Sequence, residues 1–316
     1  MTVLEAIQKG SEFLGKKKVE SPRLHAELLL AHLLKLPRMK LYLNFDRVLS
    51  PVETDALREL IKRRGLREPL QHIVGSTSFC GLELAVNRHA LIPRPETELL
   101  AELGWQFLLA RQPPARLADE PLTAAAPAAG ATRALDFGTG TGCLAIALAT
   151  KCPSASITAL DISADALALA RQNAAAHQVA ERIEFLQGDG RVALANAAQA
   201  LTGPPRTYDL IISNPPYIPS AEIATLEPEV RDFDPRAALD GGADGLDFYR
   251  TLARQAGRLL QPHGKIMLEF GDGQADAIKK IFGEEHWTIE AVKADYSQRA
   301  RMLVASVGAR APALSR

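Results

Sequence analysis

The amino-acid sequence predicts an α/β fold, in which a mostly parallel sheet carries helices on both faces, preceded by a small helical domain. From residue 133 onward, short apolar runs typical of buried strands alternate with longer helix-like segments. Several of these runs end in loops rich in Gly, Asp or Pro, where open α/β sheets bind ligands. The first 65 or so residues instead carry helical periodicity and helix-start signals.

Two helix starts are marked in the N-terminal segment. Ser21-Pro22 supplies an expected N-cap and a proline at the first helical position before the apolar run LHAELLLAHLLKL. Ser50 and Glu53 have capping-box spacing, and Gly65 is expected to end the helix that they begin. We therefore predict a helical domain over residues 1–75.

The rest of the chain divides into a connecting segment and the α/β domain. Residues 76–111 are expected to form a β-hairpin-like connection and the start of the α/β domain, which continues over residues 112–316. Within it, residues 112–133 are rich in Ala and Pro without an apolar period, so we predict a flexible surface insertion. The expected strands are ALDFG, SITALDI, RIEFLQGD, DLIIS and GKIMLEF.

The first expected strand of the sheet runs into the glycine-rich loop Asp136–Gly142. Alternating glycines let the backbone approach a ligand closely and turn into a helix whose N–H groups face that ligand. A tight strand-to-helix turn without a ligand is the simpler interpretation, and the loop lacks the Gly-Lys-Ser/Thr of a P-loop. The candidate cofactor-binding residues here are Gly138, Thr139, Gly140, Thr141 and Gly142.

The next two strands end in acidic residues. Asp161 follows the glycines by roughly 20 residues, the place of the carboxylate that binds ribose hydroxyls in dinucleotide sites. Its alternative role is a helix N-cap, for which Ser163 is better placed. Asp189 and Gly190 end the third strand, where a side chain can meet an adenine amino group or where a plain β-turn suffices. NAD and S-adenosylmethionine both satisfy these loops.

The fourth strand ends in the rigid corner Asn214-Pro215-Pro216-Tyr217. Proline has no backbone N–H to donate. Because the two prolines also prevent a helix from forming here, the carbonyl groups of the corner are not taken up by helical hydrogen bonds. Methyl transfer to an amide or exocyclic nitrogen requires hydrogen-bond acceptors that engage the hydrogens of that nitrogen. These hydrogen bonds orient the nitrogen lone pair toward the methyl group. The Asn214 oxygen and the Pro215 carbonyl are candidate acceptors, and Tyr217 can pack on the planar group. This corner favours S-adenosylmethionine over a nicotinamide cofactor and requires no metal.

The balanced charge gives no whole-chain field that would indicate a nucleic-acid partner. Lys plus Arg and Asp plus Glu number 37 each, although residues 1–75 hold 14 basic and 9 acidic side chains, a net of +5. The three cysteines form no C-x-x-C pair. Because the chain shows no signal peptide and no apolar run of about 18 residues, we expect a cytoplasmic protein without a membrane partner.

The motifs together resemble a known family. Asp136–Gly142 combined with Asn214–Tyr217 is similar to the class I S-adenosylmethionine-dependent amino-methyltransferases. The stretches LIPRPETELL (91–100), DPRAALDGGADGLDFYR (234–250) and SPRLHAELLLAHLL (21–34) resemble the PrmC/HemK group. The resemblance covers nearly the whole chain.

The resemblance implies a Rossmann-like class I methyltransferase fold with S-adenosylmethionine as cofactor. It also implies transfer of the methyl group to the side-chain N5 of the glutamine in the Gly-Gly-Gln motif of bacterial peptide chain release factors. These would be the protein partners, with no direct nucleic-acid substrate. The chain departs from the group at the insertion 112–133 and at Gly190, where a larger or aromatic residue often packs on adenine.

The resemblance also assigns roles to single residues. The loop Gly138–Gly142 would wrap the methionine part of the cofactor and Asp161 would bind its ribose. Asn214 would touch both cofactor and substrate amide. Arg94 and Thr97 would close over the methionine end, although a structural ion pair of Arg94 with Glu96 or Glu98 is an equal alternative. The glutamine pocket would be completed by Pro215, Pro216 and Tyr217.

Three alternatives to release factor methylation remain open. A ribosomal-protein glutamine methyltransferase of the PrmB group usually carries Pro-Arg-Ser-Pro where this chain has Pro93–Glu96. A nucleic-acid amino-methyltransferase can use the same Asn-Pro-Pro-Tyr corner but should carry a basic groove. A binding module that kept the fold without catalysis would not need the intact corner. We expect the basic helical domain to dock the protein substrate.

Overall fold

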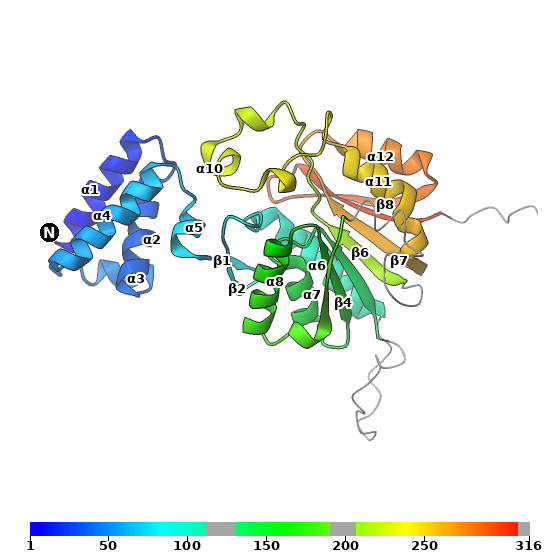
Figure 1. The fold of residues 1–316 in the computed structure, drawn as a ribbon, viewed down its shortest axis with the longest axis horizontal. Coiled ribbons are helices and arrows are strands. Elements are labelled where there is room, and N and C mark those ends of the chain that lie inside the picture. The colour runs from blue at the N-terminus through cyan, green and yellow to red at the C-terminus, as the bar shows by residue number, and fades with distance from the viewer. Residues whose placement is uncertain (112–130, 190–206, 309–316) are drawn as a thin grey trace, which may run out of the picture. The chain divides into compact units, whose positions relative to one another are not determined.

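The computed structural model describes residues 1–111, 131–189 and 207–308, which form two compact units (Figure 1). The first unit comprises Met1–Ser76, Val86–Arg88 and Thr225–Asp234, and the second comprises the remainder. Most of the predicted insertion, residues 112–130, lies outside the described residues. In the described part of the chain, no helix is long and apolar enough to cross a membrane.

The first unit is helical, as its sequence pattern predicts. An apolar core gathers side chains from all of its N-terminal helices, including Ile7, Leu14, Leu29 and Leu30. The segment from Thr225 to Asp234 adds a short helix, α10 (Pro228–Arg231). The N-terminal helices are α1 (Val3–Lys16), α2 (Pro22–Leu34), α3 (Arg38–Tyr42), α4 (Pro51–Gly65) and α5 (Leu70–Val74).

The second unit contains a seven-stranded sheet with the order β5-β4-β3-β6-β7-β9-β8. The first five strands in this order run parallel, whereas β9 is antiparallel to both of its neighbours. The mostly parallel sheet predicted from the sequence is therefore confirmed. The strands are β3 (Arg133–Phe137), β4 (Ser156–Asp161), β5 (Ile183–Gln187), β6 (Tyr208–Ser213), β7 (Leu260–Glu269), β8 (Trp287–Ala294) and β9 (Ala300–Val307).

Helices cover both faces of this sheet (Figure 1). Successive strand residues point to opposite faces, so Ala134 joins one core cluster and Leu135 the other. One face packs against α6 (Pro95–Arg111), α7 (Cys143–Lys151) and α8 (Ala164–Ala176). The other packs against α11 (Asp247–Gln255) and α12 (Ala275–Glu284).

Short elements complete the chain. A two-stranded sheet pairs β1 (Ser76–Phe79) with β2 (Leu82–Ala85), as the predicted hairpin-like connection requires. The 3-10 turns are η1 (Ala180–Arg182), η2 (Ile223–Thr225), η3 (Arg236–Ala238) and η4 (Ala256–Leu259).

The sheet order fixes where a ligand can bind. From β3, the chain continues outward to β4 and β5 and then returns to β6 on the other side of β3. This reversal creates a crevice at the carboxyl ends of the strands, the usual ligand site of such sheets. The glycine-rich motif follows β3, Asp161 ends β4, and the Asn-Pro-Pro-Tyr corner follows β6.

Candidate active site

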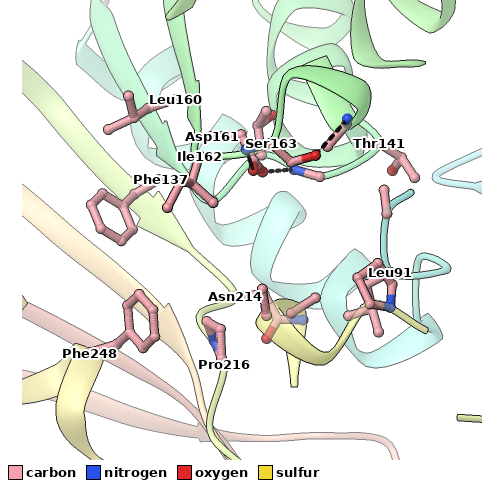
Figure 2. A pocket seen from close by; sticks show the side chains of 18 of the residues that line it. Leu91, Phe137, Thr141, Leu160, Asp161, Ile162, Ser163, Asn214, Pro216 and Phe248 are labelled. Atoms are coloured by element: carbon pink, nitrogen blue, oxygen red, sulfur yellow. Dashed lines mark hydrogen bonds between the residues drawn. The ribbon is translucent and has the colours of Figure 1, made fainter. Parts of the chain in front are cut away.

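A cavity of about 570 Å³ lies at the carboxyl ends of these strands and is lined by residues of all three loops (Figure 2). Its walls include most of the residues that the sequence nominates. From the first loop come Gly138, Thr139, Gly140 and Thr141. From elsewhere come Arg94, Asp161, Asp189, Asn214 and Pro216.

The glycine-rich loop needs its glycines for backbone conformation. Gly138, Gly140 and Gly142 have φ angles of 75°, 54° and 81°, a region that disfavours residues with a Cβ. A Cβ on Gly142 would also lie 3.1 Å from the Ala170 Cβ, so this glycine lets α7 approach α8. A Cβ on Gly138 would meet no protein atom within 4 Å, which leaves open space beside the loop.

Asp161 ties two of the loops together. One carboxylate oxygen accepts the Gly140 N–H at 2.8 Å and the other accepts the Ser163 N–H at 2.9 Å (Figure 2). Each oxygen keeps further lone-pair capacity, so the carboxylate can still accept hydroxyl donors. Ser163 is the N-cap of α8, its hydroxyl accepting the Ala166 N–H, as the sequence predicts.

Asp136 lies beneath the glycine loop and is 1% exposed. Its Oδ2 accepts the Thr139 hydroxyl at 2.6 Å and the Ala145 N–H at 3.1 Å, which ties the end of β3 to the first turn of α7. Burial raises the pKa of Asp136 to about 7, against the opposing effect of these two donors. The sequence analysis gave this residue no role of its own.

An apolar wall faces the region where a nucleoside would bind. Ile162 directly follows Asp161, is 56% exposed and lines the cavity together with Leu160 (Figure 2). An exposed isoleucine beside the Asp161 carboxylate offers an apolar surface for a planar base. Asp189 lines the same cavity, whereas Gly190 lies outside the described residues. Ile162 is absent from the residues that the sequence motifs nominate, and the one signal for it is its position immediately after the acidic residue.

The corner after β6 places Asn214 at the cavity. The Asn214 side-chain nitrogen donates to the Thr97 hydroxyl at 3.1 Å, and that hydroxyl donates to the Glu269 carboxylate at 2.7 Å. Glu269, the last residue of β7, is 3% exposed, and burial raises its pKa to about 7. Sequence reasoning missed Glu269 because nothing in GKIMLEF distinguishes a functional acid from a strand end.

The remaining corner residues support the cavity from behind. Pro215 is buried, and the Tyr217 carbonyl accepts the Gln274 side-chain amide at 2.9 Å. Burial raises the pKa of Tyr217 to about 12, so its phenol is neutral at physiological pH. In the described part of the chain, Gly142, Pro215 and Tyr217 are not among the lining residues. Their assigned roles remain predictions.

A glycine-rich turn after residue 240 packs directly against this corner. The Gly241 N–H donates to the Ile218 carbonyl at 2.9 Å. A Cβ on Gly241 would lie 2.8 Å from the Pro216 carbonyl oxygen, and one on Gly245 would lie 2.2 Å from that of Tyr217. The Asp-Gly-Gly-Ala-Asp-Gly stretch therefore fits tightly behind the Pro-Pro-Tyr backbone, a role that the sequence analysis did not assign.

The cavity residues fit S-adenosylmethionine. The loop at Gly138 leaves space for the backbone to contact a ligand, and Asp161 retains acceptors for two ribose hydroxyls. Ile162 and Leu160 supply an apolar surface for adenine. Arg94 also lines the cavity, near where the resemblance places the methionine end.

Comparisons with known proteins agree with this geometry. Residues 5–75 match the PrmC N-terminal domain, and residues 120–226 match the methyltransferase small domain. The solved structure of SMU.776 complexed with SAH matches with a TM-score of 0.50 and 14% identity, covering 74% of this chain and 56% of that chain. This likeness supports the class I methyltransferase fold.

Two curated relatives match almost the full length. A release factor glutamine methyltransferase of Geobacter sulfurreducens is 41% identical over 281 residues, which cover 89% of this chain and 88% of the relative. A second, from Chlorobaculum tepidum, is 39% identical over 302 residues, covering 96% of each chain. With this identity over both the helical unit and the methyltransferase domain, the chain belongs to the release factor glutamine methyltransferase family.

Proposed function

We propose that this protein transfers the methyl group of S-adenosylmethionine to the side-chain N5 of the glutamine in the Gly-Gly-Gln motif of peptide chain release factors. The observation that carries the proposal is the orientation of Asn214 at the cavity. Because its amide nitrogen donates to Thr97, its amide oxygen is the acceptor that remains for a substrate. Family membership names the substrate that this acceptor would hold.

A glutamine amide nitrogen is a poor nucleophile, since its lone pair is delocalised into the carbonyl. The Asn214 oxygen and the Pro215 carbonyl would each accept one of its two hydrogens. Two acceptors fix the plane of the amide, direct its lone pair toward the methyl group and stabilise the positive charge that develops on nitrogen. When bound, the cofactor would supply an electrophilic methyl group on a sulfonium: the nitrogen–methyl bond would form in line as the methyl–sulfur bond breaks, and one of the two amide hydrogens would leave as a proton.

The other cavity residues would hold the reactants in line. The glycine loop and Asp161 would bind the cofactor's methionine and ribose parts, and Pro216 would form the wall beside the amide. Tyr217 stays a neutral phenol and would complete the glutamine pocket from behind the corner. Positioning of this kind is the main source of rate in a reaction without a covalent enzyme intermediate.

The experiment presents three potential acceptors with S-adenosylmethionine in parallel: purified release factor, ribosomal protein and RNA. Mass spectrometry then finds which one gains a methyl group. We expect one methyl on the Gly-Gly-Gln glutamine of the release factor. Methylation of ribosomal protein or RNA instead would establish one of the alternative substrates. Cofactor binding without turnover on any acceptor would identify a binding module.

A further inference from the structure

A chain of hydrogen bonds runs from the protein interior to the cavity through three different elements. Glu269 ends β7, Thr97 lies in the first turn of α6, and Asn214 follows β6. Glu269 and Thr97 are only 3% and 2% exposed. The Thr97 hydroxyl donates to Glu269 Oε2 at 2.7 Å and accepts the Asn214 amide N–H at 3.1 Å.

The direction of each bond follows from the number of hydrogens. A carboxylate has no hydrogen to donate, so the single hydroxyl hydrogen of Thr97 must point at Glu269. The Thr97 oxygen can then only accept, which requires the nitrogen end of the Asn214 carboxamide to face it. The oxygen end of that carboxamide is consequently turned away from Thr97.

We propose that Thr97 and Glu269 are positioning residues, which hold the Asn214 carboxamide with its oxygen toward the substrate amide. This inference rests on the proposed function. Without them the Asn214 amide could rotate by half a turn and present N–H groups to the N–H groups of the substrate. Two donors facing each other repel and leave both amides unsatisfied in a buried site.

The surroundings of Glu269 add a pH dependence to this arrangement. Burial raises its pKa to about 7, opposed by hydrogen bonds from Thr97 and Asn214 and by Arg301, while Glu96 raises it further. Two neutral phenols complete the surroundings: Tyr249, which donates to the Glu269 carbonyl at 2.8 Å, and Tyr217. When Glu269 is protonated, its carboxyl hydrogen can be donated to the Thr97 oxygen. The hydroxyl hydrogen of Thr97 can then be donated to the Asn214 side-chain oxygen. Turnover is therefore expected to fall as pH drops through about 7.

The first test compares two substitutions of Thr97. Thr97→Val keeps the shape but removes the hydroxyl, and we expect kcat on release factor to fall roughly tenfold or more with KM little changed, the scale of one lost hydrogen bond. Thr97→Ser retains the hydroxyl and should restore most of kcat. Thr158→Val removes another buried hydroxyl, one bonded to Tyr208 in the sheet, and serves as the matched control. A kcat for Thr97→Val equal to that of the control would overturn the inference.

A double-mutant cycle separates positioning from general packing. In an Asn214→Ala background there is no carboxamide to orient, so Thr97→Val should lower kcat no further. An equal additional loss in that background would show that Thr97 acts independently of Asn214 and would overturn the inference.

The second test does not depend on whether a Thr97 variant folds. Glu269→Gln cannot ionise, so its kcat should be low and flat between pH 6 and 8, whereas wild-type kcat should rise across that range. A Glu269→Gln profile that still rises like the wild type would overturn the inference. Failure of the proposed function is distinguishable, because wild-type protein would then leave release factor unmethylated at every pH.

Discussion

At the residue scale, one carboxylate, that of Asp161, both ties two loops together and is the proposed ligand of the cofactor's ribose. Its two oxygens hold the Gly140 and Ser163 N–H groups, and so join the glycine loop to the start of α8. The same oxygens are the proposed acceptors for the ribose hydroxyls. A neutral or truncated side chain would therefore affect both the ligand and the shape of the loop that receives it.

We predict that Asp161→Ala weakens S-adenosylmethionine binding by roughly 100-fold or more. Two charge-assisted hydrogen bonds are lost, each contributing about 1.5–3 kcal/mol. Titration calorimetry measures the affinity, and the melting temperature reports whether the protein remains folded. Asp55→Ala, which removes an exposed carboxylate of the helical unit, is the control. Unchanged affinity in folded Asp161→Ala protein would remove Asp161 from the binding site.

Asn214 supplies the second residue-scale prediction. Asn214→Ala should lower kcat by about 100- to 1000-fold, by analogy with the loss of one oxyanion-hole donor, with a much smaller change in melting temperature. Asn214→Asp keeps an acceptor but loses the N–H that Thr97 accepts, and it places a second carboxyl close to Glu269. We expect this variant also to turn over slowly. A structural strand terminator would give the reverse result: lower melting temperatures with near-normal kcat.

Sequence reasoning reached some of these residues and not others for a physical reason. Asp161 ends a strand and Asn214 follows one, each within a short motif whose spacing is itself informative. The motif at residues 91–100 drew attention to Thr97 but not to Glu269, because the two are separated by more than 170 positions and become neighbours only when α6 packs beside β7. No local pattern marks such a pair, so it emerges only from the folded chain.

At the scale of elements, Asp136 joins the end of β3 to the beginning of α7. Both of its donors, the Thr139 hydroxyl and the Ala145 N–H, bond to the same oxygen. The second oxygen is buried and makes no hydrogen bond within the described structure. A buried carboxylate with one unpaired oxygen is costly to ionise, which accounts for its raised pKa.

We predict that Asp136→Asn stabilises the protein increasingly as pH rises from about 4 to about 7. The carboxyl pKa is raised to about 7 in the folded state, so the folded protein binds more protons than the unfolded chain in this window. As pH rises, the contribution of the Asp136 carboxyl to the free energy of unfolding therefore falls by at most about 1.4 kcal/mol per pH unit. Asparagine cannot ionise, yet its carbonyl can accept both donors.

Urea unfolding of the wild type and Asp136→Asn at pH 5, 6, 7 and 8 measures this difference. Asp276→Asn is the control, because this exposed carboxyl pairs with Lys279 and its pKa is lowered rather than raised. Unfolding free energies of wild type and Asp136→Asn that change in parallel with pH would contradict the prediction.

The helix starts show how far local sequence determines an element. The predicted capping box is confirmed: Glu53 N–H donates to the Ser50 hydroxyl at 3.2 Å, and Ser50 N–H to the Glu53 carboxylate at 2.8 Å. Ser21 occupies the predicted N-cap position of α2, but its φ of 46° is left-handed and its side chain makes no capping hydrogen bond. Pro22 alone begins α2. Gly65 does end α4, but its lack of a Cβ admits the Phe13 ring, 2.5 Å from where that atom would be.

At the scale of the whole molecule, the helical unit is completed by a segment far away in sequence. Glu229 accepts from Arg64 and from Arg67, each at 2.6 Å, and Arg67 also pairs with Glu227 at 2.7 Å. Arg64 is 3% exposed, so removing Glu229 would leave its charge poorly compensated. No sequence pattern indicates that residues 225–234 belong to this unit, because long-range ion pairs have no local signature.

These pairs also change which basic residues can dock a substrate. Arg63 bonds to Glu68, and Arg64 and Arg67 are engaged by Glu227 and Glu229, so most of the basic residues between positions 62 and 67 are neutralised within the unit. A separate basic run, Lys16–Lys18, is exposed at the end of α1. If the helical unit docks the release factor through charge, this run of three exposed lysines offers a contact.

We therefore predict that replacing Lys16, Lys17 and Lys18 together by Gln raises KM for release factor severalfold at low salt and leaves kcat and cofactor affinity unchanged. Surface charges act mainly on encounter and are screened by salt, so the difference in KM from wild type should shrink as ionic strength rises from about 0.05 M to 0.5 M. Replacing Lys279, Lys280 and Lys293 by Gln removes the same charge from exposed positions of α12 and β8 and is the matched control. Docking through Lys16–Lys18 would be contradicted by a KM that stays at the wild-type value or that rises equally in both triple variants. Such a result would indicate that an uncharged face of the helical unit binds the release factor.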